Sequence, residues 1–225
     1  MNEHLVSQYE NKPHLQYFLS ARKEMLPFIP KSCRRLLDVG CSAGGFGEMI
    51  KKELGAEAWG IDLSPTAAEI AKGKLDKVIN APFSDEVELP DQYFDVITFN
   101  DCLEHFPDPY PPLELCKKKL TADGLVVCSL PNVRYIDNVF HFLIEKDWKY
   151  QDSGILDHTH LKFFTKKSML RTFENAGYEV LSITGINPHY WSGKKIFLLN
   201  LFFGKWIEDM KFLNYVVVAK PIRVS

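Results

Sequence analysis

Short apolar runs alternate along the chain with segments whose apolar residues recur at helical spacing. The runs that predict strands lie at residues 36–39, 58–63, 77–81, 94–101 and 125–130. Between the first two runs, Phe46, Met49, Ile50 and Leu54 share one face of a helix. Further helices are expected at 65–74 and 110–120. This alternation predicts an α/β fold built on a mainly parallel sheet.

The two ends of the chain differ from this alternation. Residues 1–33 are expected to form a mostly helical lead-in that ends at Pro27 and Pro30. Towards the other end, Thr165 is placed to cap a helix that stops at Gly177, and strands are expected at 178–186 and 215–221. Two longer segments, 133–164 and 187–213, interrupt the pattern, and we expect them to cover the substrate side. The first contains an amphipathic stretch from Ile136 to Ile144.

Composition and charge limit the classes of protein to which the chain could belong. A chain of 225 residues with 46% hydrophobic and 25% charged residues suits one globular domain, 1–225. The net charge of −2 lacks the basic footprint of nucleic-acid binding, so no nucleic-acid partner is expected. Five scattered cysteines without a C-x-x-C pair favour reduced thiols, and the start of the chain lacks the pattern of a signal peptide. We therefore expect a cytoplasmic protein.

The stretch from Leu36 to Gly47 has the pattern of a nucleotide site. An apolar strand ends near Asp38, a loop of small residues follows, and a helix begins, so backbone N–H groups can face a ligand. Ser42 stands where a dinucleotide fingerprint needs its second glycine, which argues against a nicotinamide cofactor. If the backbone at Ser42 requires a positive φ, serine is more strained there than glycine would be. Asp62 ends the second strand and can accept hydrogen bonds from both hydroxyls of a ribose, although it could also be a solvated strand-end carboxylate.

These motifs resemble class I S-adenosylmethionine-dependent methyltransferases. The pattern Asp38-x-Gly40-x-Ser42-x-Gly44 is similar to the first motif of that family, with serine in place of the middle glycine. The string from Asp101 to Pro109 resembles the branch that includes ubiquinone-pathway and sugar-modifying enzymes. The string from Gly154 to Thr165 is similar to methyltransferases associated with glycosyltransferases of surface polysaccharide synthesis, which often have arginine in place of His158.

The resemblance implies a Rossmann-like fold and a set of cofactor contacts. It implies a seven-stranded, mostly parallel sheet in the order 3-2-1-4-5-7-6, with an antiparallel last strand and helices on both faces. It also implies S-adenosyl-L-methionine as cofactor, with S-adenosyl-L-homocysteine as product. The residues expected to contact it are Asp38, Gly40, Cys41, Ser42, Ala43, Gly44, Phe46, Asp62, Leu63, Ala81, Pro82, Asp101 and Cys102. In related enzymes a lead-in segment lies over the cofactor, where Tyr9 or Arg22 could reach its methionine end, although both could equally pack or face water.

Histidines are the candidate catalytic groups. An alcohol acceptor must lose a proton, and neutral histidine suits this near pH 7. His105 follows the fourth strand, and His160 arrives with Asp157 on a later loop, so either histidine could be the base with Asp157 orienting it. Each histidine could instead be a hydrogen-bonded loop anchor. The remaining histidines include His4, His14 and His141, for which we expect structural or solvent-facing roles.

A divalent metal is a further possibility that the sequence raises. Acidic and histidine residues at 104–105 and 157–160 could together form such a site: Glu104, His105, Asp157, His158 and His160. No ligand motif of fixed spacing is present, so no metal is expected.

The first functional hypothesis is an O-methyltransferase acting on a sugar hydroxyl during glycan assembly. One alternative is methylation of a small aromatic or quinone-precursor phenol. Another is a non-catalytic accessory subunit that binds the cofactor. Residues 189–211, with His189, Tyr190 and Trp191, are expected to pack over the substrate cleft or against a second subunit, so a homodimer is possible. The apolar run 196–203 is far shorter than the roughly 20 residues of a membrane span, but it could contact a membrane surface.

Overall fold

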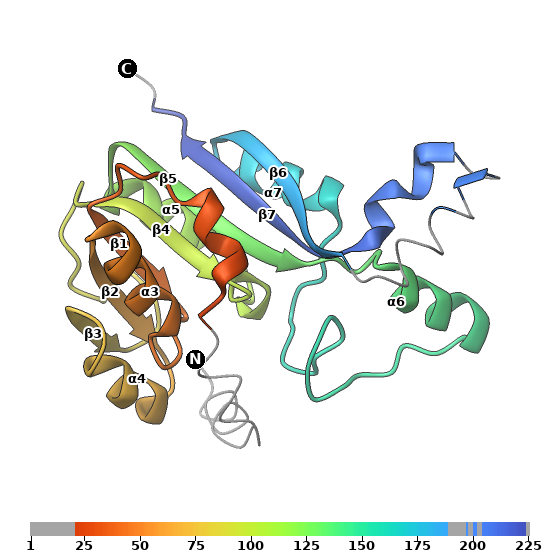
Figure 1. The fold of residues 1–225 in the computed structure, drawn as a ribbon, viewed down its shortest axis with the longest axis horizontal. Helices are drawn as coiled ribbons and strands as arrows, with labels where there is room; N and C mark the ends of the chain where they lie inside the picture. Colours follow the sequence, from red (N-terminus) through yellow and green to blue (C-terminus); the bar gives the residue numbers. More distant parts are fainter. Residues whose placement is uncertain (1–20, 189–196, 198–199, 202–203, 224–225) are drawn as a thin grey trace.

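The protein is built on one twisted sheet of seven strands. The computed structural model describes residues 21–188, 197, 200–201 and 204–223. The sheet has the order β3-β2-β1-β4-β5-β7-β6 (Figure 1). Its strands are β1 (Arg35–Val39), β2 (Glu57–Asp62), β3 (Lys77–Asn80), β4 (Phe94–Asn100), β5 (Leu120–Pro131), β6 (Tyr178–Pro188) and β7 (Phe212–Pro221). The predicted strand order is confirmed.

The directions of the strands bring the carboxyl ends of several strands together at one edge of the sheet. The ladders from β3 through β5 are parallel, whereas β7 runs antiparallel to both β5 and β6. The carboxyl ends of β1, β2 and β4 therefore lie side by side, which is where open α/β sheets bind ligands. The loops that follow Val39, Asp62 and Asn100 all begin at this edge.

Alternating side chains divide the core between the two faces of the sheet. One face carries Leu37, Ile97 and Val126 and packs against helices α5 (Tyr110–Lys119) and α7 (Lys166–Asn175). The neighbouring residues Leu36, Val96 and Val127 point to the other face, under α3 (Gly45–Leu54) and the 3₁₀ helix η1 (Lys23–Phe28). Helix α4 (Pro65–Lys72) packs there through Ala71 against Cys41 and Ala58. The expected helices on both faces are present.

Side chains cap the starts of two helices, and the cap predicted at Thr165 is one of them. Ser64 accepts a hydrogen bond from the N–H of Ala67 at the start of α4. Thr165 and Ser168 form a reciprocal capping box at the start of α7, and Gly177 follows this helix with a φ of 74°.

Several predicted bounds were wrong. In the described part of the lead-in, residues 21–33, the helical element is η1, which includes Pro27 and ends at Phe28, before Pro30. Residues 1–20, which include Tyr9, His4 and His14, lie outside the described residues. Strands β6 and β7 extend beyond the expected 178–186 and 215–221, because their antiparallel ladder continues to the Pro188–Phe212 pair.

A side lobe extends from the end of β5 and from the β6–β7 hairpin. It contains α6 (Ile136–Phe140), the π-helical turn η3 (His141–Glu145) and the 3₁₀ helix η4 (Gly204–Lys211), on the right of Figure 1. Its small core joins both predicted insertions: Tyr135, Ile136, Ile155, Leu156, Ile207 and Met210. His189, Tyr190 and Trp191 lie outside the described residues. Within the part of the chain that the structure describes, none of the helices has the length and apolar character of a membrane span.

Candidate active site

The loop after β1 has the backbone shape of a nucleotide cradle. Gly40, Ser42 and Gly44 all have positive φ values, of 74°, 48° and 74°. A Cβ at Gly40 would lie 2.5 Å from the sulfur of Cys102, so only glycine fits there. The N–H groups of Gly40 and Cys41 donate to the carbonyl of Ile61, at 2.8 and 3.1 Å, which ties the loop to β2. Gly40 thus packs closely against Cys102, and the loop is held to β2 by its backbone.

Ser42 carries the strain that its sequence position suggested. Its φ of 48° is the left-handed region, and its buried hydroxyl has no hydrogen-bond partner among the described residues. We expect Ser42→Gly to raise the free energy of unfolding by about 1 kcal/mol, because glycine adopts this conformation without the Cβ penalty. Urea unfolding of the two proteins measures the difference. Ser64→Gly, which removes a satisfied helix cap instead, should lower stability, and a loss of stability in Ser42→Gly would contradict this account.

Asp62 holds the loop and faces the same edge. Its carboxylate accepts hydrogen bonds from the backbone N–H of Ser42 at 2.7 Å and of Ser64 at 2.8 Å. Burial raises the pKa of this carboxyl, while the backbone donors act in the opposite direction. The side chain therefore joins the loops after β1 and β2 at the position where the sequence predicts a ribose.

Asp38 lies deeper, beneath the loop. It is buried, and its Oδ1 accepts hydrogen bonds from the hydroxyl of Thr98 at 2.7 Å and the amide of Asn100 at 3.0 Å. Burial raises its pKa to about 7, although both donors favour the charged form. Asp38 thus braces β1 against β4.

The other residues that are expected to contact the cofactor fall into a buried group and a half-buried group. Phe46, Cys41 and Ala43 are buried: Phe46 lies in the core with Met25 and Ile50, and Cys41 packs against Ala58. The structure therefore gives the Phe46 side chain a packing position rather than a place on the ligand edge. The half-buried residues are Leu63, Ala81, Pro82, Asp101 and Cys102, which follow the carboxyl ends of β2, β3 and β4.

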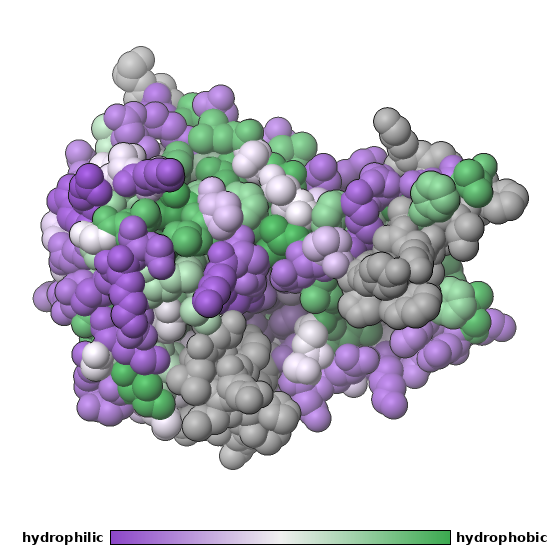
Figure 2. Space-filling model, viewed as in Figure 1, coloured by the Kyte–Doolittle hydropathy of each residue, from purple (hydrophilic) through white to green (hydrophobic). Residues whose placement is uncertain are grey.

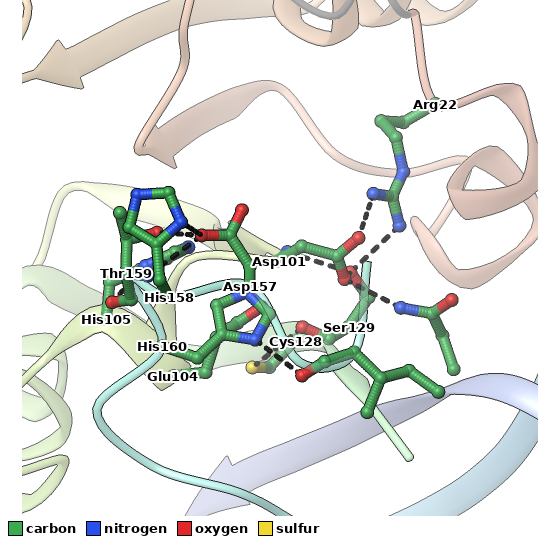
Figure 3. Close-up of polar contacts among 12 residues, drawn as sticks. Arg22, Asp101, Glu104, His105, Cys128, Ser129, Asp157, His158, Thr159 and His160 are labelled. Atoms are coloured by element: carbon green, nitrogen blue, oxygen red, sulfur yellow. Dashed lines mark hydrogen bonds and ion pairs between the residues drawn. The ribbon is translucent and has the colours of Figure 1, made fainter. Parts of the chain in front are cut away.

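A polar network after β4 involves Arg22. Arg22 forms an ion pair with Asp101 and donates to the hydroxyl of Ser129 at 3.1 Å (Figure 3). Asp101, with a φ of 49°, also accepts from Ser129 at 2.7 Å and from Asn214 at 3.1 Å. An arginine and an aspartate side by side offer partners for both charges of an amino-acid zwitterion. Sequence reasoning considered Arg22 but had no signal for its partner.

Two histidine rings are in contact near the carboxyl end of β4. The rings of His105 and His160 lie edge to face with centroids 4.7 Å apart (Figure 3). His105 Nδ1 lies 3.0 Å from the carbonyl oxygen of Thr159, and His160 Nδ1 lies 3.0 Å from that of Ile155. A carbonyl can only accept, so in a neutral ring each Nδ1 carries the proton and Nε2 is the basic atom.

Glu104 completes this cluster; the sequence grouped it with His160 only as one of five candidate metal ligands. Its carboxyl is fully buried, its Oε1 lies 3.8 Å from His160 Nε2, and neither oxygen has a hydrogen bond among the described residues. Burial raises the pKa of Glu104 well above its usual range. Its backbone carbonyl accepts from the N–H groups of Leu161 and Lys162, which fastens the later loop to the end of β4.

Asp157 and His158 occupy different positions. Asp157 is buried, and its Oδ1 accepts from both the N–H and the hydroxyl of Thr159, at 2.8 and 2.7 Å. It also lies 4.0 Å from Nδ1 of the half-exposed His158. Asp157 therefore shapes the turn that carries His160, and a role in orienting a base stays a prediction.

Three side chains of this cluster could also share a cation. Ligand atoms of Glu104, His105 and His160 all lie within 4.8 Å of one another. The Nδ1 atoms of His105 and His160 face backbone carbonyls, as is usual for histidines that bind a metal through Nε2. The expectation that no metal binds stays a prediction.

Comparison with known proteins identifies the family. Residues 11–183 match the model of a methyltransferase domain, and the chain belongs to this family. It is a class I S-adenosylmethionine-dependent methyltransferase.

Curated relatives and solved structures agree with this assignment. The chain is 32% identical to a Ubiquinone biosynthesis O-methyltransferase of Vibrio atlanticus, over 70% of this chain and 67% of the relative. It is 28% identical to the protein of the same name from Neisseria meningitidis, over 71% and 69%. A methyltransferase from Archaeoglobus fulgidus has the same fold at a TM-score of 0.64 and 23% identity, covering 97% of this chain and all of that one.

Proposed function

We propose that this methyltransferase acts on the hydroxyl oxygen of a phenol, of the kind that occurs in quinone precursors. The observation that supports a phenol is the aromatic surroundings of the histidine pair. The ring of His160 lies 6.4 Å from that of Phe163, which neighbours Trp148 at 5.2 Å and Tyr150 at 6.3 Å. Aromatic rings pack well against one another, whereas a sugar needs many polar partners. The names of the relatives support the same choice. The sugar acceptor and the role in polysaccharide synthesis that we expected first have no support from these relatives.

The cofactor end of the site fits S-adenosylmethionine. We assign Asp62 to accept hydrogen bonds from the ribose, since it lies beside the loop after β1, where a Cβ at Gly40 would have no room. Arg22 and Asp101 are the pair that we assign to the carboxylate and ammonium of the methionine end. Bound S-adenosylmethionine supplies a methyl group on a positively charged sulfur, which needs an acceptor oxygen held in line with it.

The residues after β4 supply the acceptor side. A phenol must lose its proton as its oxygen takes the methyl group, and a positioned base assists this step. We assign that role to Nε2 of His105, because its side chain is half-buried whereas that of His160 is buried. The ring of His160 contacts that of His105, and Glu104 lies 3.8 Å from Nε2 of His160, so we assign both residues a supporting role.

Transfer of a labelled methyl group from S-adenosylmethionine tests this proposal. The acceptor panel holds catechol-type phenols, nucleotide sugars, free oligosaccharides and bulk RNA, with Asp62→Ala as the blank. We expect label in the phenols that disappears in the blank. Label confined to the sugar fraction would overturn the phenol assignment and restore the glycan alternative. Tight cofactor binding without transfer to any phenol would also count against it.

A further inference from the structure

The outer face of helix α7 carries exposed basic side chains without acidic partners. Lys166, Lys167 and Arg171 are exposed, and none of them forms an ion pair with a residue that the structure describes. Helical spacing places Lys167 and Arg171 one turn apart on one face, beside Leu170, which exposes 38% of its surface. We call Lys166, Lys167, Leu170 and Arg171 the basic face of α7.

Lysines on the helices across the sheet are paired within their own helix. On α3, Lys52 lies 2.6 Å from Glu48, and on α4, Lys72 lies 2.6 Å from Glu69. The acid of α7, Glu174, comes near the end of that helix and forms no ion pair among the described residues. The basic face of α7 therefore keeps a positive charge that α3 and α4 neutralise locally.

The positions of these charges do not favour the helix itself. Lys166 and Lys167 are the first two residues of α7, its first turn holds no acid, and its last turn holds no basic residue. The helix dipole favours the opposite arrangement, with acids at the start and bases at the end. Side chains that act against local stability are expected at surfaces that bind another molecule.

The positive charge continues from α7 towards the loop that carries His160. Lys162 and Leu161 precede the helix, both are exposed, and their N–H groups donate to the carbonyl of Glu104. The sequence has no acidic residue from 158 to 173. A molecule bound to the basic face of α7 would thus lie next to the segment that joins this helix to the acceptor side of the site.

An acidic protein surface suits this face better than a nucleic acid does. Nucleic-acid binding draws on a broad basic footprint, whereas this chain has a net charge of −2 and few cations on this face. Leu170 lies among the cations, and Leu161 exposes 43% of its surface nearby in the sequence. Apolar side chains within a charged rim are typical of protein interfaces. Opposite charges speed up the encounter of two proteins, and burial of a leucine adds affinity.

We propose that the basic face of α7 is a docking surface for an acidic partner protein, on which acidic side chains surround an apolar one. The acids pair with Lys166, Lys167 and Arg171, and the apolar side chain covers Leu170. The length of α7, about 15 Å for ten residues, matches a small and transient interface. The proposal does not depend on which acceptor the enzyme methylates.

A defined peptide tests the docking surface on the full chain. The probe is a fluorescent amphipathic peptide of roughly 18 residues, about five helical turns, with glutamates on both sides of a leucine stripe. We expect fluorescence anisotropy to show binding at about 50 mM salt that weakens at least tenfold at about 500 mM, because salt screens exposed charges. The variant K166E/K167E should lower the affinity by about tenfold or more, since it sets like charges against the peptide.

The matched control makes the same change of charge on the other face of the sheet. K52E/K72E replaces one lysine on α3 and one on α4, where Figure 2 shows hydrophilic and hydrophobic side chains mixed over the surface. This control should bind the peptide within about twofold of the parent. K166E/K167E should unfold at the same or a higher temperature than the parent, because it places acids at the start of α7. Lost binding in that variant therefore does not come from unfolding.

A double-mutant cycle distinguishes a protein partner from polyanions in general. Serine in place of the peptide leucines should weaken binding to the parent by about threefold or more, and should have little further effect on Leu170→Ser. Absence of this coupling, or tighter binding of poly(U) RNA than of the peptide, would overturn the assignment to a protein. So would no binding at low salt, or equal losses in K166E/K167E and K52E/K72E. The binding is measured without an acceptor, so a failure to methylate phenols would reject only the proposed function.

Discussion

Asp62→Ala is expected to weaken binding of S-adenosylhomocysteine by a factor on the order of 10² to 10⁴. Each hydrogen bond to a charged group contributes about 1.5–3 kcal/mol, and we assign this carboxylate to accept one from each ribose hydroxyl. The substitution also removes the acceptor of the N–H groups of Ser42 and Ser64, so the loop after β1 loses its support. Isothermal titration calorimetry of both proteins with S-adenosylhomocysteine measures the effect.

Asp76, which comes just before β3, provides the control. Asp76 accepts from the N–H of Ala58 at 2.9 Å and pairs with Lys51, near the start of β2 and away from the ligand edge. Asp76→Ala removes a comparable set of contacts and should leave cofactor affinity within about twofold of the parent. Equal loss in the two variants would mean that Asp62 acts through general stability, and retained affinity in Asp62→Ala would remove it from the cofactor site.

The strand, loop and helix at the start of the sheet could be predicted because their residues are neighbours in the sequence. A strand, a small-residue loop and a helix form from local patterns, and Asp62 ends the very next strand. The same motif raised the question of a positive φ at Ser42, and the structure has one there. Parallel topology then places the ends of β1, β2 and β4 together.

The acceptor half depends on contacts between distant segments, which no local pattern contains. Glu104 and His160 are far apart in the sequence and meet only because the later loop donates two backbone hydrogen bonds to the Glu104 carbonyl. Asp157 next to a histidine suggested a dyad, but its nearest donors are on Thr159. The apolar positions from 136 to 144 had helical spacing, yet spacing cannot tell that Ile136 is buried while Leu143 and Ile144 are exposed.

His105→Ala is expected to lower the rate of phenol methylation by about 10² to 10⁴, which is the usual contribution of a general base. Affinity for S-adenosylhomocysteine should stay within about twofold of the parent, since the ring lies on the acceptor side of the edge. Single-turnover methyl transfer, with cofactor affinity measured in parallel, separates the two effects.

His160→Ala and His141→Ala complete this test. The side chain of His160 is more deeply buried than that of His105 and contacts its ring, so its loss should lower both the rate and the free energy of unfolding. His141 lies on η3 with its ring exposed near Glu145, so His141→Ala should leave transfer unchanged. If His160→Ala loses at least as much rate as His105→Ala while its stability is unchanged, His160 is the base. If neither variant loses rate, deprotonation of the acceptor needs no protein base, and the histidine pair anchors the loop that closes over the end of β4.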